Sequence, residues 1–181
     1  SAMLMIVMAV ALTSNLPRHT ENRGSETYLG TLISIPRTFV GEPTLLLPGL
    51  LAVLIFASFS TFWTALVFPL TAPPFLYSHG QIGLFGLVGV AGAIAATHAG
   101  RLADRGYGQW TTGASLTLLL LSWGLISLLP FSMSLLILGV LLLDLAVQAV
   151  HVTNLGVIVA LHPKMNGRLI GGYMVFYSIG S

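Results

Sequence analysis

The sequence predicts an all-α membrane protein, a polytopic bundle of apolar helices, and three observations support this prediction. Of the 181 residues, 55% are hydrophobic and only 7% are charged, whereas about a quarter are charged in soluble domains. Uncharged apolar runs of membrane-spanning length recur along the chain. All seven Lys and Arg residues lie between alternate runs. Transmembrane β-strands would alternate with period two, and these runs do not.

The first apolar run, Met3 to Leu16, is short for a membrane span. Its 14 residues would reach about 21 Å as a helix at 1.5 Å per residue, less than the roughly 30 Å of a bilayer core. We interpret residues 1–16 as the end of a truncated transmembrane helix. A signal peptide is the alternative because Ala9-Val10-Ala11 is similar to a cleavage site, although no Lys or Arg precedes the run.

Residues 17–46 contain the polar part of the chain and are predicted to form a cytoplasmic central loop between two bundles. Three of the five acidic residues lie here, at Glu21, Glu26 and Glu42. Apolar residues recur at helical spacing between Tyr28 and Ile33, which indicates a short helix on the membrane surface. A flexible linker with scattered apolar residues is the alternative.

Residues 47–181 are predicted to form a C-terminal transmembrane bundle. Crossings are expected at about 47–70, 82–99, 111–129, 133–161 and, incompletely, 169–181. Cytoplasmic loops retain Lys and Arg, and exported loops do not. The cations precede the first of these crossings or follow the second or the fourth: Arg18, Arg23, Arg37, Arg101, Arg105, Lys164 and Arg168. The uncharged connections 71–81 and 130–132 are therefore predicted to face the exterior or periplasm.

A charged, glycine-containing turn joins the second and third of these crossings, from Gly100 to Gly108. Glycine allows the chain to reverse sharply, and Asp104 is expected to cap the following helix or to accept hydrogen bonds from the arginines. The segment resembles the loop signature of the major facilitator superfamily, G-x-L-a-D-[RK]-x-G-[RK]-[RK]. The matching positions are Gly100, Leu102, Ala103, Asp104 and Arg105, and the departures are Tyr107, Gln109 and Trp110.

Other segments are similar to the drug/proton antiporter branch of bacterial members. They are Phe62-Trp63-Thr64, residues 82–87, residues 148–154, Arg168-Leu169 and Gly172-Tyr173-Met174. The resemblance implies a major-facilitator-type half, truncated at both ends, from the end of helix six to the start of helix eleven. It further implies secondary active transport of a small molecule, with proton-coupled efflux, in a bacterial inner membrane. The implied partners are the substrate, protons, the lipid bilayer and the N-terminal half of the same transporter.

One helix face in the fourth of these crossings gathers polar groups at membrane depth. Asp144, Gln148 and His151 fall within about 60° of one another at 100° per residue. A carboxylate at this depth costs at least about 2.5 kcal/mol, so something must compensate it. Because Asp and His can exchange protons, the trio is a candidate proton or substrate site. The alternative is a hydrogen-bonded pair that only fixes helix packing.

A second candidate lining consists of Ser60, Trp63 and Thr64 in the first of these crossings. Hydroxyls and an indole suit an amphipathic substrate, but Ser and Thr also bond to their own helix backbone, and aromatic residues often face lipid.

Small residues four apart in residues 89–100 predict close helix packing. A nucleotide loop is disfavoured there because no Gly-Lys-Ser/Thr follows.

Several functional classes lack support in the sequence. The histidines have no metal-ligand spacing, and no cofactor fingerprint, catalytic array or nucleic-acid signal is present. We therefore expect no metal, no cofactor and no enzymatic activity. The competing function is that of a non-transporting membrane interaction or assembly fragment.

Overall fold

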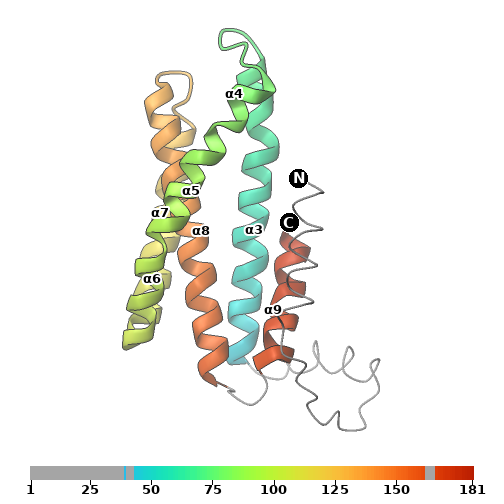
Figure 1. Ribbon diagram of the computed structural model, residues 1–181, viewed down its shortest axis with the longest axis vertical. Helices are drawn as coiled ribbons and strands as arrows, with labels where there is room; N and C mark the ends of the chain where they lie inside the picture. Colours follow the sequence, from blue (N-terminus) through green and yellow to red (C-terminus); the bar gives the residue numbers. More distant parts are fainter. Residues whose placement is uncertain (1–38, 40–42, 162–165) are drawn as a thin grey trace, which may run out of the picture. The chain divides into compact units, whose positions relative to one another are not determined.

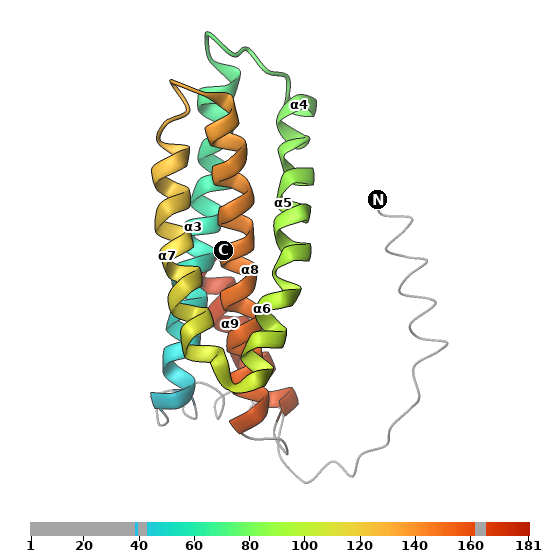
Figure 2. The same cartoon turned by 90° about the vertical axis from the view of Figure 1, so that its left-hand side faces the viewer.

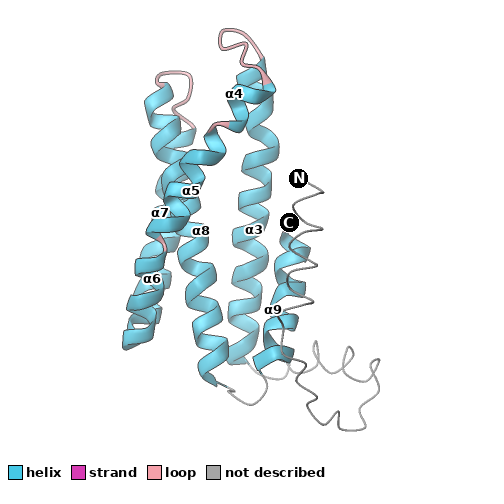
Figure 3. Ribbon diagram, in the orientation of Figure 1, coloured by secondary structure: helices cyan, strands magenta, loops and turns pink. Residues whose placement is uncertain are grey.

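The computed structural model describes Phe39, residues 43–161 and residues 166–181, all within the compact unit Ser34–Ser181 (Figure 1). The truncated first helix, the surface helix at 28–33 and Lys164 lie outside the described residues, as does most of the predicted central loop. The described part consists of helices and short connections, without strands (Figure 3). The predicted all-α fold class is confirmed.

Seven helices and one π-helical turn follow one another in the described part of the chain. They are α3 (Pro43–Thr71), α4 (His79–Gly83), α5 (Phe85–Ala95), α6 (Thr97–Leu102), η1 (Ala103–Tyr107), α7 (Gly108–Ile126), α8 (Met133–Leu161) and α9 (Asn166–Gly180). Three helical stretches are long and apolar enough to cross a membrane: Thr44–Thr71, His79–Ile126 and Met133–Leu161. The second of these reverses direction at Gly106, where φ is +90°. It therefore contains two antiparallel arms, α4 to α6 and α7 (Figure 2).

The first arm begins three residues before the predicted crossing at 82–99. Ser78 and Gln81 form a capping box: the Ser78 hydroxyl accepts from the Gln81 backbone N–H at 3.4 Å, and the Gln81 side chain accepts from the Ser78 N–H at 2.9 Å. This box satisfies backbone donors that a helix start would otherwise leave free. The arm is then interrupted at Leu84 and at Ala96, which both keep right-handed helical dihedral angles. Three short helices thus replace one continuous helix.

Helix α8 is the central element of the bundle and contacts α3, α5, α6, α7 and α9. Its apolar residues join side chains from the neighbouring helices in a continuous core, which explains why α8 is the most buried of the long helices. The fully buried core residues of α8 include Leu136, Val140, Leu143, Val147 and Val150. A smaller cluster packs α9 onto α3 and α8 through Phe39, Leu45, Ala52, Ile158, Leu169 and Tyr173.

Two glycines let helix backbones approach α8 closely. A Cβ at Gly92 of α5 would lie 2.7 Å from the Leu141 carbonyl oxygen and 2.9 Å from the Leu145 nitrogen. A Cβ at Gly139 of α8 would lie 3.1 Å from the Ser122 carbonyl oxygen in α7. Only glycine fits both crossings without a backbone shift, as expected for membrane helices that pack through small residues.

The connections of the bundle lie at two opposite ends. The segments 72–78 and 127–132 lie together at one end, and η1 with Arg105 lies at the other (Figures 1 and 2). This arrangement places the described cation-bearing turn opposite the two connections that lack Lys and Arg. Which end faces the cytoplasm remains a prediction of the charge pattern.

Candidate functional site

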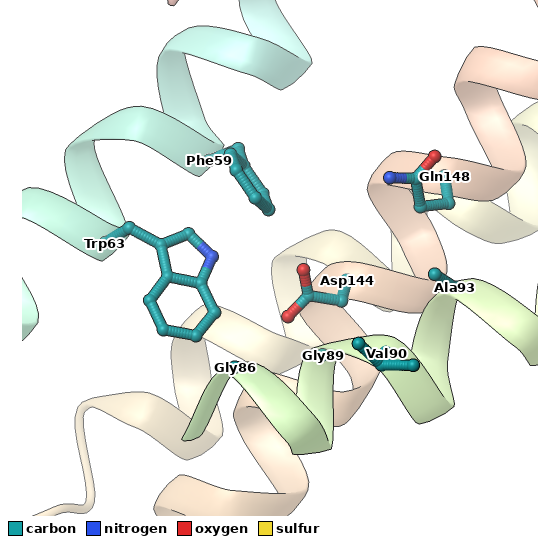
Figure 4. Close-up of a pocket in the computed structure, with 8 residues that line it drawn as sticks. All are labelled: Phe59, Trp63, Gly86, Gly89, Val90, Ala93, Asp144 and Gln148. Carbon is teal, nitrogen blue, oxygen red and sulfur yellow. The ribbon is translucent and has the colours of Figure 1, made fainter. Parts of the chain in front are cut away.

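A cavity of about 470 Å³ lies between α3, α5 and α8 (Figure 4). Helix α3 contributes two aromatic side chains, α5 contributes a wall of small residues, and α8 contributes an acid and an amide. The lining residues are Phe59, Trp63, Gly86, Gly89, Val90, Ala93, Asp144 and Gln148. Its volume lies within the roughly 300–1,000 Å³ range of small-molecule sites.

The acid of this cavity is buried without a hydrogen-bond partner. Asp144 is only 5% exposed, and its Oδ2 is a buried oxygen that receives no hydrogen bond. The missing side chain of Gly89 leaves it room, because a Cβ there would lie 2.8 Å from Oδ2. A buried polar atom without a partner costs about 1–3 kcal/mol. In the described part of the chain Trp63 and Thr153 also have such an atom, and Asp144 is the one acid among the three.

The structure shows no hydrogen-bonded pair within the polar stripe of α8. Asp144 bonds to neither Gln148 nor His151. Gln148 lines the same cavity as Asp144, whereas His151 points toward α3 and α9. The three residues lie within about 60° of one another around α8, but different neighbouring helices pack against this face along its length.

The indole of Trp63 forms the opposite wall of the cavity. Its Nε1 is buried and has no acceptor. In Figure 4 the nitrogen lies on the side of the ring that faces Asp144. The Phe59 ring stands beside it, with ring centroids 6.2 Å apart. The cavity therefore contains one buried donor and one buried acceptor without partners, flanked by aromatic side chains.

His151 belongs to a separate, paired network. Its Nδ1 lies 3.1 Å from the Tyr173 hydroxyl of α9, and its ring meets Phe56 of α3 edge-on with centroids 5.5 Å apart. Asn154 donates to the Pro48 carbonyl oxygen at 3.2 Å. The network ties α8 to α3 and α9. Neither Asn154 nor Tyr173 was predicted to belong to such a network, although polar groups in apolar helices generally find partners.

The predicted lining by Ser60, Trp63 and Thr64 is divided between two faces of α3. Trp63 lines the Asp144 cavity, while Ser60 and Thr64 line a second cavity of about 540 Å³ beside the end of α9. Residues four apart share a helix face, and Trp63 is turned about 100° from Thr64. The three side chains therefore do not form one site.

The residues of the loop signature lie at the end of α6 and in η1. Gly100 packs closely on α8, since a Cβ there would lie 2.8 Å from Val152 Cγ1. Leu102, Asp104 and Arg105 are exposed. The expectation that Asp104 caps α7 is wrong, because α7 starts after Tyr107 without a side-chain cap. The positive φ of Gly106 makes the reversal instead.

No group of three or more His, Cys, Asp or Glu residues among those that the structure describes could hold a metal ion. The lining of the Asp144 cavity likewise contains a single ionisable side chain. The arrangement suits binding of a small ligand or a proton, through one carboxyl, one indole N–H and one amide. Fold and cavity together define an α-helical bundle of membrane-length apolar helices, with a cavity between them that is lined by one acid and one amide among apolar residues.

Comparison with known proteins finds relatives that are named as transporters. The chain is 47% identical, over 183 aligned positions, to the uncharacterized transporter YgaY of Escherichia coli, in strains K12 and O157:H7. The alignment covers 99% of this chain and 45% of each relative, so the chain spans about half the length of the curated relatives it matches. No protein-family profile and no solved structure matches the chain.

Proposed function

We propose that this chain is one half of a secondary active transporter of the major-facilitator type, which exports a small molecule in exchange for protons. The name of the relatives supports transport in general. The loop signature from Gly100 to Arg105 and the similarity to drug/proton antiporters support the finer assignment. The other half of the relatives' length is the proposed partner bundle, and the proposed location is the bacterial inner membrane.

The observation that carries this proposal is the free carboxyl of Asp144 in the cavity between α3, α5 and α8. Ionisable residues inside membrane proteins mark substrate and proton pathways because a merely structural charge there would be costly. The other titratable groups nearby, His151, Tyr173 and Tyr177, lie on the α9 side of the bundle. Asp144 is therefore the proposed proton-exchanging group of the cavity.

In the proposed cycle the two bundles rock against each other and open the cavity to each side in turn. Asp144 takes up a proton on one side and releases it on the other. The close backbone crossing at Gly92 keeps α5 and α8 together during this motion. The turn from Gly100 to Gly108 holds the ends of α6 and α7 in one relative position.

Replacing Asp144 in the complete carrier tests the proposal. Asp144→Asn keeps the size of the side chain and removes its exchangeable charge. We expect the variant to insert at the wild-type level and to lose the pH dependence of efflux from membrane vesicles. An unchanged pH profile would remove Asp144 from the coupling mechanism. A wild-type complete protein that moves no substrate at any pH would favour the assembly fragment over the carrier.

A further inference from the structure

We infer that the Asp144 cavity binds a small amino alcohol, a ligand with a protonated amine and a neighbouring hydroxyl group on an apolar body. The inference rests on the proposed transport function in one respect: it takes this ligand to be the substrate that is transported. The binding chemistry itself is argued from the atoms of the cavity.

The two buried polar atoms without partners in the cavity specify two ligand groups. Asp144 Oδ2 lacks a donor, and Trp63 Nε1 lacks an acceptor. Both atoms are buried, both belong to residues that line the same cavity, and Figure 4 shows the indole nitrogen turned toward the carboxyl. One ligand that donates to the carboxyl and accepts from the indole would satisfy both atoms at once. A binding site built to hydrogen-bond a ligand group binds analogues without that group much more weakly, because its own buried polar atoms then stay unpaired.

The electrostatics of the cavity identify the donating group as a cation. Asp144 is the single ionisable residue among those that line the cavity. A buried carboxylate needs a compensating charge with hydrogen-bonding capacity. The faces of Phe59 and Trp63 add favourable cation–π interactions. A protonated primary or secondary amine supplies both the charge and the N–H.

The remaining walls set the size and polarity of the ligand. Gly86, Gly89, Val90 and Ala93 present a smooth apolar surface from α5, and the two aromatic rings face them from α3. This lining suits a compact apolar body such as a phenyl group. A hydroxyl next to the amine provides the acceptor for Trp63 Nε1. A quaternary ammonium group cannot donate to Asp144 Oδ2, because it has no N–H.

Binding of four matched compounds to the complete carrier tests the inference. The compounds are 2-amino-1-phenylethanol, phenethylamine without the hydroxyl, 1-phenylethane-1,2-diol without the amine, and the N,N,N-trimethyl derivative of the amino alcohol. Isothermal titration calorimetry in lipid nanodiscs gives each Kd. We expect the amino alcohol to bind tightest, with each missing group weakening binding by roughly tenfold.

Two conservative variants assign the two contacts. Trp63→Phe keeps an aromatic ring and removes the N–H, so the amino alcohol should lose its advantage over phenethylamine. Asp144→Asn should remove the advantage of the amino alcohol over the diol, and retained diol binding shows that this variant is folded. Trp123→Phe is the matched control, because the Trp123 indole already donates to the Ser58 hydroxyl at 2.8 Å.

Three results would overturn the inference. They are equal Kd values for all four compounds, tighter binding of the trimethyl derivative, and the same change in Trp123→Phe as in Trp63→Phe. Failure of the transport proposal has a different signature. A carrier that binds the amino alcohol with the expected ranking but moves nothing across proteoliposome membranes supports this inference and contradicts transport.

Discussion

The polar stripe of α8 has two ends that the bundle uses differently. At Asp144 the stripe faces the glycine-rich surface of α5 and leaves a carboxyl oxygen without a partner in a cavity. Two turns further on, His151 faces α3 and α9, and its Nδ1 lies 3.1 Å from the Tyr173 hydroxyl. Nearby, Asn154 donates to the Pro48 carbonyl oxygen. One end is open to a ligand, and the other fastens three helices together.

The difference teaches that the role of a polar residue inside a membrane bundle depends on whether its side chain has hydrogen-bond partners. Paired groups such as His151 and Asn154 have hydrogen-bond partners in the folded protein, so their burial is compensated and they stabilise the fold. An unpaired group such as Asp144 is unfavourable in the empty protein and becomes favourable when a proton or ligand arrives. Substitutions at the two ends should therefore separate effects on stability from effects on binding.

The largest effect on stability is expected where α5 meets the backbone of α8. A methyl group at Gly92 would overlap the Leu141 carbonyl and the Leu145 nitrogen, so Gly92→Ala should destabilise the folded carrier by about 1–3 kcal/mol. Gly86→Ala is the control because a Cβ there has no atom within 4 Å. The free energy of unfolding in detergent micelles measures both. Equal values for the two variants would contradict the close crossing.

A smaller loss of stability is expected at the paired end. Tyr173→Phe removes the hydroxyl that contacts His151, which should lower the free energy of unfolding by about 0.5–1.5 kcal/mol. Because the cavity is untouched, the pH profile of efflux should match that of the wild type. If Tyr173→Phe instead shifted the pH profile of efflux and left the free energy of unfolding unchanged, the His151 end would be the functional one, which contradicts this assignment.

The smallest change in stability, but a distinct change in binding, is expected at Gly89. Its added methyl group would meet the end of the Asp144 side chain, which can turn aside more easily than a backbone can move. Gly89→Ala should therefore unfold nearly like the Gly86→Ala control yet bind 2-amino-1-phenylethanol more weakly. In the Asp144→Ala background the substitution at Gly89 should have no further effect on binding. Additive losses in the double variant would show that Gly89 acts independently of Asp144.

The all-α class, the long apolar helices and the buried acid were predictable because hydropathy and intramembrane charge act locally along the chain. The three-part arm from His79 to Leu102 was not, since the interruptions at Leu84 and Ala96 fall inside a run that reads as one span. The separation of His151 from Asp144 also escaped prediction. Periodicity gives the direction of a side chain from its own helix, but the partner it meets depends on tertiary packing.

The central claim is that Asp144 carries an unpaired carboxyl that faces an accessible cavity, and carbodiimide labelling tests it most directly. Dicyclohexylcarbodiimide is an apolar reagent that reacts with protonated carboxyl groups. Mass spectrometry of the folded complete carrier should find the adduct on the peptide that contains Asp144, and Asp144→Asn should abolish it. A folded carrier whose Asp144 stays unmodified, while the denatured protein is modified there, would contradict the account.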